Sequence, residues 1–130
     1  MSQVLLNTLT AHHDVSILTE DSFADFVNGH PDRVSMVFFT GDPAKKLETA
    51  DVAVVVRELL TQHPGKVQLG IVAPDHERVL MKTCAVSALP SLVFFVEGRQ
   101  RAVLPKIQDW SVYAEKLDEL FTHLPEGEAA

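Results

Sequence analysis

Short, almost wholly apolar runs that alternate with helical patterns are the feature that most constrains the fold of this chain. Val34–Phe39 is nearly all apolar, which predicts a central strand covered on both faces of a sheet, and the other two runs predict further strands. Val15 and Ile17 flank Ser16 and predict one further, shorter strand. The three apolar runs are Val34–Phe39, Val67–Ala73 and Ser91–Val96.

Apolar residues at helical spacing occupy the segments between and after these strands. The second helical segment is rich in valine, so packing rather than helix propensity must hold it. The expected N-caps are Thr19 for the first helix, Thr49 or Asp51 for the second, Asp75 for a short third that runs to about Ala85, and Asp109 for the last. The apolar faces are Phe23, Phe26 and Val27 in the first helix, Val52, Val55, Val56, Leu59 and Leu60 in the second, and Trp110, Tyr113, Ala114, Leu117, Leu120, Phe121 and Leu124 in the last, where they are expected to be core.

The order of these elements predicts an α/β fold with a mixed central sheet and helices on both of its faces. A turn at Glu97-Gly98 is expected to link Ser91–Val96 to a return strand over Arg99–Leu104. No repeat or linker interrupts the order, so residues 1–130 are interpreted as a single domain with a core over about 15–124. A short amphipathic helix over 3–13 and a flexible acidic tail over 125–130 are expected outside this core.

Composition excludes several classes of protein. The longest wholly apolar runs are five residues, which is far short of the ~20 needed to span a bilayer. The first 32 residues contain no lysine or arginine, so the basic region of a secretory signal is missing, and we expect a cytoplasmic protein with no membrane insertion. A single cysteine, Cys84, excludes an internal disulfide and a self-contained dithiol pair.

The charge of the chain is acidic and unevenly spread. Its formal net charge of −7 argues against nucleic acid or an anionic membrane as a partner. Residues 1–32 and 109–130 are strongly acidic, whereas residues 33–108 carry ten basic and seven acidic side chains. The acidic ends favour association with a basic partner, and the exposed side of the last helix (Glu115, Asp118 and Glu119) is one candidate surface for it.

Three segments in this order resemble the thioredoxin fold, a three-layer α/β/α sandwich. Leu18–Phe23 matches the start of the first thioredoxin helix, Val34–Phe39 the strand that leads to its active site, and Ala88–Leu92 the loop that carries a cis proline. The resemblance places Gly41-Asp42-Pro43-Ala44 where thioredoxin has Cys-Gly-Pro-Cys. Both cysteines are therefore missing, and thiol–disulfide exchange has no attacking thiolate there.

Further segments narrow the resemblance to the HupG/HyaE family of hydrogenase expression/formation proteins, over residues 15–124. They are Gly41–Pro43, Glu48–Val56, Leu89–Phe94 and Ile107–Trp110. This resemblance implies a non-catalytic chaperone in the maturation of membrane-bound [NiFe]-hydrogenases, with no cofactor. The partner that it implies is the hydrogenase small subunit precursor with its twin-arginine leader, bound before export, and other maturation proteins are possible further partners.

A twin-arginine leader combines two cationic side chains with an apolar stretch, so its chaperone needs an apolar groove beside acidic groups. In redox members of the fold, a substrate segment lies between the loop ahead of the second helix and the cis-proline loop. We therefore hypothesise a peptide groove there, with apolar contacts from Phe39, Pro43, Leu89 and Pro90 and charge from Asp42, Glu48 and Asp51. The alternatives are core or loop packing for Phe39, Leu89 and Pro90, and helix capping for Asp51.

No catalytic or metal-binding residue is predicted. Cys84 is interpreted as a small buried hydrophobe, and its spacing from His76 does not bring the two into contact on a helix. The six histidines are scattered without the spacing of a zinc site. Two other functions stay open: a scaffold that joins maturation factors without binding the leader, and a thiol–disulfide oxidoreductase that uses Cys84 with an external thiol.

Overall fold

The structure is a computed structural model that describes residues 14–42 and 44–124. The helix expected over 3–13, Pro43 of the proposed groove and the tail over 125–130 lie outside the described residues.

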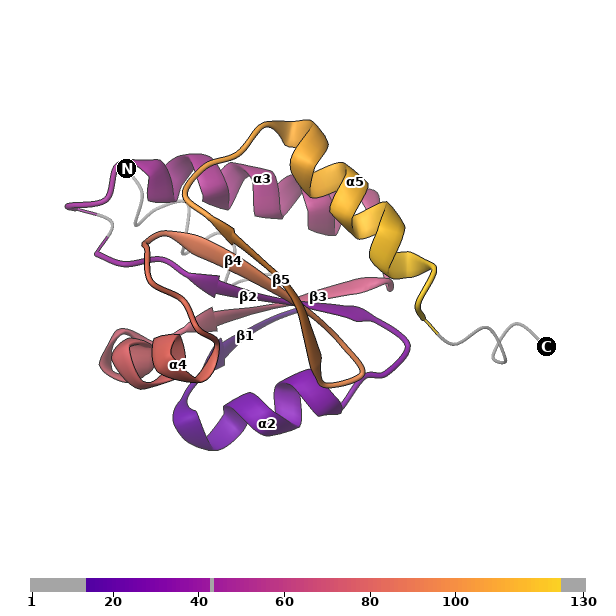
Figure 1. Cartoon of the computed structure of the whole chain (residues 1–130), viewed down its shortest axis with the longest axis horizontal. Helices are drawn as coiled ribbons and strands as arrows, with labels where there is room; N and C mark the ends of the chain where they lie inside the picture. Colours follow the sequence, from indigo (N-terminus) through magenta and orange to yellow (C-terminus); the bar gives the residue numbers. More distant parts are fainter. Residues whose placement is uncertain (1–13, 43, 125–130) are drawn as a thin grey trace.

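A five-stranded mixed sheet forms the middle layer, in the order β1-β3-β2-β4-β5 (Figure 1). The neighbours β1–β3 and β3–β2 are parallel, whereas β2–β4 and β4–β5 are antiparallel. This arrangement confirms the predicted mixed sheet and the hairpin at Glu97-Gly98. The strands are β1 (Val15–Leu18), β2 (Val34–Phe39), β3 (Val67–Val72), β4 (Ser91–Val96) and β5 (Arg99–Pro105).

Helices cover both faces of the sheet, which confirms the three-layer sandwich. Figure 1 shows α3 and α5 on one face and α2 and α4 on the other. The helices are α2 (Glu20–Asn28), α3 (Glu48–Gln62), α4 (Glu77–Thr83) and α5 (Trp110–Phe121), and a 3₁₀ turn, η1 (Pro74–His76), precedes α4.

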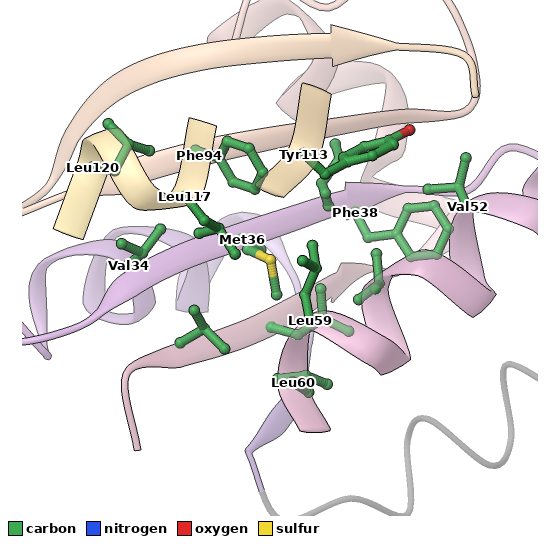
Figure 2. Packing of buried hydrophobic residues seen from close by; sticks show 14 of the residues in the cluster. Val34, Met36, Phe38, Val52, Leu59, Leu60, Phe94, Tyr113, Leu117 and Leu120 are labelled. Carbon is green, nitrogen blue, oxygen red and sulfur yellow. The ribbon is translucent and has the colours of Figure 1, made fainter. Parts of the chain in front are cut away.

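Two apolar cores lie on opposite sides of the sheet, because successive side chains of a strand point to opposite faces. Met36 and Phe38 of β2 enter the core under α3 and α5, where Figure 2 shows them facing Tyr113 of α5 and Leu59 of α3. Val37 and Phe39 enter the other core, with Leu18, Val27, Leu80 and Cys84. β2 is buried throughout, as its apolar run predicts, and β3 and β4 are buried throughout as well.

The structure places Thr19 and Asp109 at the N-cap positions predicted for them and corrects the starts of the two helices between them. The Thr19 hydroxyl accepts a hydrogen bond from the Ser22 amide, within a complete capping box. The α3 helix begins at Glu48 with Leu47 at the N-cap position, so the predicted caps Thr49 and Asp51 both lie inside the helix, and no side chain caps it. Asp75 lies inside η1 rather than at a cap, and Asp109 occupies the N-cap position of α5 without a capping hydrogen bond.

The predicted core face of α5 is correct at its centre and wrong at its beginning. Tyr113, Leu117 and Leu120 are buried, whereas Trp110 is 41% exposed and Phe121 only partly buried. Helical periodicity marks which side of a helix is apolar, but not how far along the helix the sheet extends. Trp110 precedes the part of α5 that packs on the sheet.

Candidate functional site beside the cis-proline loop

The loop after β2 meets the loop before β4 at one end of the sheet. Gly41 has a φ of 68°, and a Cβ added to it would lie 3.2 Å from the Cβ of Leu89. The peptide bond between Leu89 and Pro90 is cis, as the thioredoxin resemblance implies. The Pro90 carbonyl accepts a hydrogen bond of 2.7 Å from the Lys106 amide, so the first residue of the loop between β5 and α5 is tied to the same place.

Short-range hydrogen bonds shape the loop that follows Gly41. The Asp42 carbonyl accepts from the amides of Lys45 and Lys46, and one Asp42 carboxylate oxygen accepts from the Ala44 amide at 3.0 Å. At the other end, the buried Thr49 hydroxyl donates to the Thr40 carbonyl at 2.6 Å. The loop therefore forms a turn that is closed by its own hydrogen bonds and is anchored to the end of β2.

Of the three described residues that were predicted to supply apolar contacts, Leu89 is the one placed at an accessible surface. Leu89 is partly buried and lines two hollows, one on each side of it. Phe39 is fully buried in the core under α2 and α4, because the strand alternation of β2 directs it there. Pro90 is also buried, although it borders one hollow. For Phe39 the structure therefore supports the packing alternative.

The three predicted acidic residues have different environments. Asp42 and Asp51 are exposed. A carboxylate oxygen of Glu48 accepts the Ile107 amide at 3.0 Å, which joins the start of α3 to the loop ahead of α5. Sequence reasoning missed a fourth carboxylate: Glu77 of α4 accepts the Gly41 amide at 3.0 Å.

The first hollow beside Leu89 is lined mainly by apolar side chains, and we call it the apolar hollow. It measures about 530 Å³, and Pro74, Met81, Val86 and Leu89 form its apolar wall. Glu77, Arg78 and Lys82 stand around it. Its residues come from η1, α4 and the loop after α4, so no single segment has a spacing from which the hollow could be predicted.

The second hollow lies between Leu89 and the start of α3, and we call it the lysine hollow. It measures about 240 Å³ and is lined by Lys45, Lys46, Leu47, Glu48, Leu89, Pro90 and Lys106. Glu48 is the one predicted acidic residue among these, and three lysines outnumber it. The charge next to Leu89 is thus basic on this side, where the sequence hypothesis has acidic groups.

Comparison with known proteins identifies the family of the chain. The family model described as Hydrogenase-1 expression protein HyaE matches residues 5–113. The chain is 32% identical to the hydrogenase expression/formation protein HupG of Bradyrhizobium diazoefficiens, over 98% of this chain and 86% of that protein. This chain belongs to the HyaE/HupG family. It is a hydrogenase expression/formation accessory protein.

Solved structures agree with this family and with the thioredoxin-like fold. A crystal structure described as HupG from Rhodopseudomonas palustris is 34% identical and covers 83% of this chain and 96% of its own, with a TM-score of 0.57. A thioredoxin from Halobacterium salinarum covers 81% of this chain and 88% of its own, with a TM-score of 0.67. Its 18% identity shows a shared fold alone.

The one cysteine of this HyaE/HupG protein is unsuited to redox chemistry. Cys84 is 1% exposed, and its burial raises the pKa of the thiol from 9.0 to about 11. Thiolate is the reactive form, and a neutral pH leaves almost none of it. The Nδ1 atom of His76, the histidine nearest to Cys84 in the sequence, lies 3.2 Å from a carboxylate oxygen of Glu20.

The described part of this HyaE/HupG protein contains neither a cluster of metal-ligating side chains nor a helix suited to cross a membrane. Across residues 14–42 and 44–124, no three histidine, cysteine, aspartate or glutamate side chains gather in a way that could hold a metal ion. Of the helices in the described ranges, none combines the length and the apolar character that crossing a bilayer requires.

Proposed function

We propose that this accessory protein is a non-catalytic chaperone of the [NiFe]-hydrogenase small subunit precursor and that it binds the twin-arginine leader beside Leu89. The observation that carries the proposal is the apolar hollow of about 530 Å³ that Leu89, Met81 and Val86 line next to the cis-proline loop. Family membership supports a role in hydrogenase maturation. The buried, protonated Cys84 supports a binding role rather than thiol exchange.

Burial of the apolar stretch of the leader supplies most of the affinity in this proposal. Each Å² of apolar surface removed from water contributes about 25 cal/mol before the costs of ordering. An arginine paired with an exposed carboxylate adds only about 0.2–1 kcal/mol. Two such pairs are therefore a minor contribution, and the binding should tolerate moderate salt.

The charges around Leu89 constrain how the leader would lie. Its arginines would be repelled by the lysine hollow and by Arg78 and Lys82 at the apolar hollow. We place the apolar stretch in the apolar hollow and the arginines toward Asp42 and Asp51, the exposed carboxylates among the predicted charged residues. In this arrangement, Glu48 positions the start of α3 through Ile107 instead of contacting the leader.

A titration of the full chain with a synthetic twin-arginine leader peptide tests the proposal. We expect Leu89→Gln to weaken binding about tenfold, because it places an amide in the wall of the apolar hollow. Val79→Gln is the matched control: Val79 lies on α4, is 46% exposed and does not line the hollow. It should leave the affinity unchanged, and the melting temperatures of both variants should stay near that of the wild type.

The same titration includes a leader peptide whose apolar stretch is replaced by serine and glycine. This peptide should bind poorly. Equal binding of the two peptides would refute the apolar hollow as the leader site. Equal binding of the small subunit with and without its leader would favour a scaffold function instead.

A further inference from the structure

The lysine hollow is a basic site in an acidic protein. Lys45, Lys46 and Lys106 line it in a chain whose formal net charge is −7. Within the described ranges, none of the three ammonium groups lies within 4 Å of a carboxylate, because the ion pairs there are Arg33–Asp14, His76–Glu20 and Lys116–Glu119. The three charges are therefore available to a ligand.

The one carboxylate among the residues that line this hollow, Glu48, accepts a hydrogen bond from the backbone. Glu48 accepts the Ile107 amide through one oxygen, so it is held at the base of the loop ahead of α5. Its charge offsets one of the three lysines and leaves the hollow with a formal charge of +2. This balance opposes the arginines of a leader and favours an anionic group.

Lys106 is held in the hollow by an unusual backbone conformation. Its φ is 60°, in the left-handed region that favours glycine and costs other residues about 1–2 kcal/mol. Its amide donates to the Pro90 carbonyl at 2.7 Å and its carbonyl accepts from the Tyr113 hydroxyl at 3.3 Å. The other non-glycine residues with positive φ, Ala85 and Glu97, sit at a helix end and in a hairpin turn. Lysine at position 106 therefore carries a backbone cost that glycine would not carry.

We propose that the lysine hollow binds an acidic segment of a protein partner, in which at least two carboxylates flank an apolar side chain. Leu47 supplies the apolar contact, since it is 82% exposed at the edge of the hollow. The volume of about 240 Å³ is below the ~300–1,000 Å³ of sites for small organic ligands, which favours a few side chains of a peptide over a cofactor. The acidic segment is distinct from the cationic leader, so this inference stands whether or not the leader binds in the apolar hollow.

An NMR titration of the ¹⁵N-labelled full chain tests this inference with three blocked pentapeptides. Each has a central leucine, flanked by two glutamates on either side in the first, by glutamines in the second and by lysines in the third. We expect the glutamate peptide to shift the amides of Lys46, Leu47, Leu89 and Lys106 and to bind about tenfold more tightly than the glutamine peptide at low salt. The lysine peptide should not shift them.

Variants in which glutamine replaces basic residues test whether the lysines of the hollow bind the glutamate peptide. The triple variant Lys45→Gln, Lys46→Gln, Lys106→Gln should weaken binding of the glutamate peptide about tenfold. Each exposed ion pair that is lost lowers the affinity by about 1.4- to 5-fold, and three such losses combine to about this value. The triple variant Arg57→Gln, Arg99→Gln, Arg101→Gln is the matched control, because it changes the net charge equally at exposed positions outside the hollow. It should keep the affinity within about twofold.

The variant Lys106→Gly distinguishes a loss of peptide binding from a loss of stability. Glycine adopts the left-handed conformation freely, so this variant should melt no lower than the wild type and yet bind the glutamate peptide about two- to fivefold more weakly. The inference is overturned if the glutamate and glutamine peptides bind equally, or if the two triple variants lose affinity equally. It is also overturned if inorganic phosphate shifts the same amides at the same concentration, since the hollow would then be a site for small anions.

Discussion

Gly70 lies in β3 directly against the side chain of Leu18 from β1. A Cβ at position 70 would approach the Leu18 Cγ to 2.7 Å, and Leu18 is fully buried. The absence of a side chain at this position therefore lets the edge strand and its leucine pack over the centre of β3. At the residue scale, the packing of β1 on β3 thus depends on a small side chain at position 70 as well as on the apolar character of Leu18.

We expect Gly70→Ala to lower the free energy of unfolding by about 1–3 kcal/mol through overpacking. Gly65→Ala is the matched control: its cost comes only from a φ of 77°, because nothing lies within 4 Å of the added Cβ. A double-mutant cycle with Leu18→Ala, followed by urea denaturation, distinguishes them. Gly70→Ala should couple to Leu18→Ala by at least about 0.5 kcal/mol, whereas Gly65→Ala should be additive. Additivity in both cycles would contradict the packing described for Gly70.

Cys84 makes stability depend on pH in the alkaline range. The unfolded thiol ionises near its ordinary pKa of 9.0, whereas burial raises the pKa of the folded thiol to about 11. Stability from this group is therefore complete below pH 9 and is lost as the pH rises toward 11, by about 2–3 kcal/mol in total.

Cys84→Ala should remove this contribution to the pH dependence. Denaturation of the wild type and the variant at pH values from about 8 to 10.5 measures it, and the buried Tyr113, whose pKa burial also raises, is common to both proteins. The free energies of unfolding should converge as the pH rises. A constant difference across this range would show that the thiol is not buried as described.

At the scale of elements, α3 is anchored by tertiary contacts at its start. Its N-cap position is Leu47, which makes no side-chain hydrogen bond. Instead, the Thr49 hydroxyl donates to the Thr40 carbonyl at the end of β2, and Glu48 accepts the Ile107 amide ahead of α5. These two contacts fix the walls of the lysine hollow.

Thr49→Val should therefore lower the free energy of unfolding by about 1–3 kcal/mol, because it keeps the shape of the side chain but removes the hydrogen bond to the buried Thr40 carbonyl. Thr61→Val on the same helix is the control: Thr61 is exposed and donates to Arg57 within its own turn. Its effect should stay within about 0.5 kcal/mol. Equal effects of the two substitutions, measured by urea denaturation, would show that the anchor does not stabilise α3.

The elements that sequence could predict are those whose signals are local. Apolar runs such as Val34–Phe39 mark central strands because burial on both faces leaves no polar positions, and the α5 periodicity marks Tyr113 and Leu117 as core. The start of α3 could not be predicted, because the hydroxyl of Thr49 is used by Thr40 of another element. Asp75 could not be assigned correctly, since η1 interrupts the segment before α4 begins.

In the candidate site too, some features could be predicted from the sequence, whereas others depend on contacts between distant segments. Gly41 and Leu89 were placed together by their resemblance to the thioredoxin loops, and the structure brings them into contact. The core that buries Phe39 could not be predicted, because it depends on which face of the sheet the side chain at this position of β2 points to. The hollows could not be predicted, because Met81, Val86 and Lys106 come from segments that only the fold brings to Leu89.

At the scale of the whole molecule, a thioredoxin-like scaffold without its cysteine pair surrounds Leu89 with one apolar and one basic hollow. The acidic sequence ends and the basic hollow give the surface two signs of charge, which suits a partner whose segments also differ in charge. In the function that we propose, the apolar stretch of a twin-arginine leader, rather than its charge, provides the main part of binding.

A calorimetric titration of the full chain with the hydrogenase small subunit, with and without its leader, measures this contribution. At about 50 mM and about 200 mM salt, we expect the precursor to bind at least about tenfold more tightly than the leaderless subunit, with less than about a tenfold loss between the two salt concentrations. Equal affinity for the two forms of the subunit, or binding that disappears at the higher salt concentration, would contradict the account.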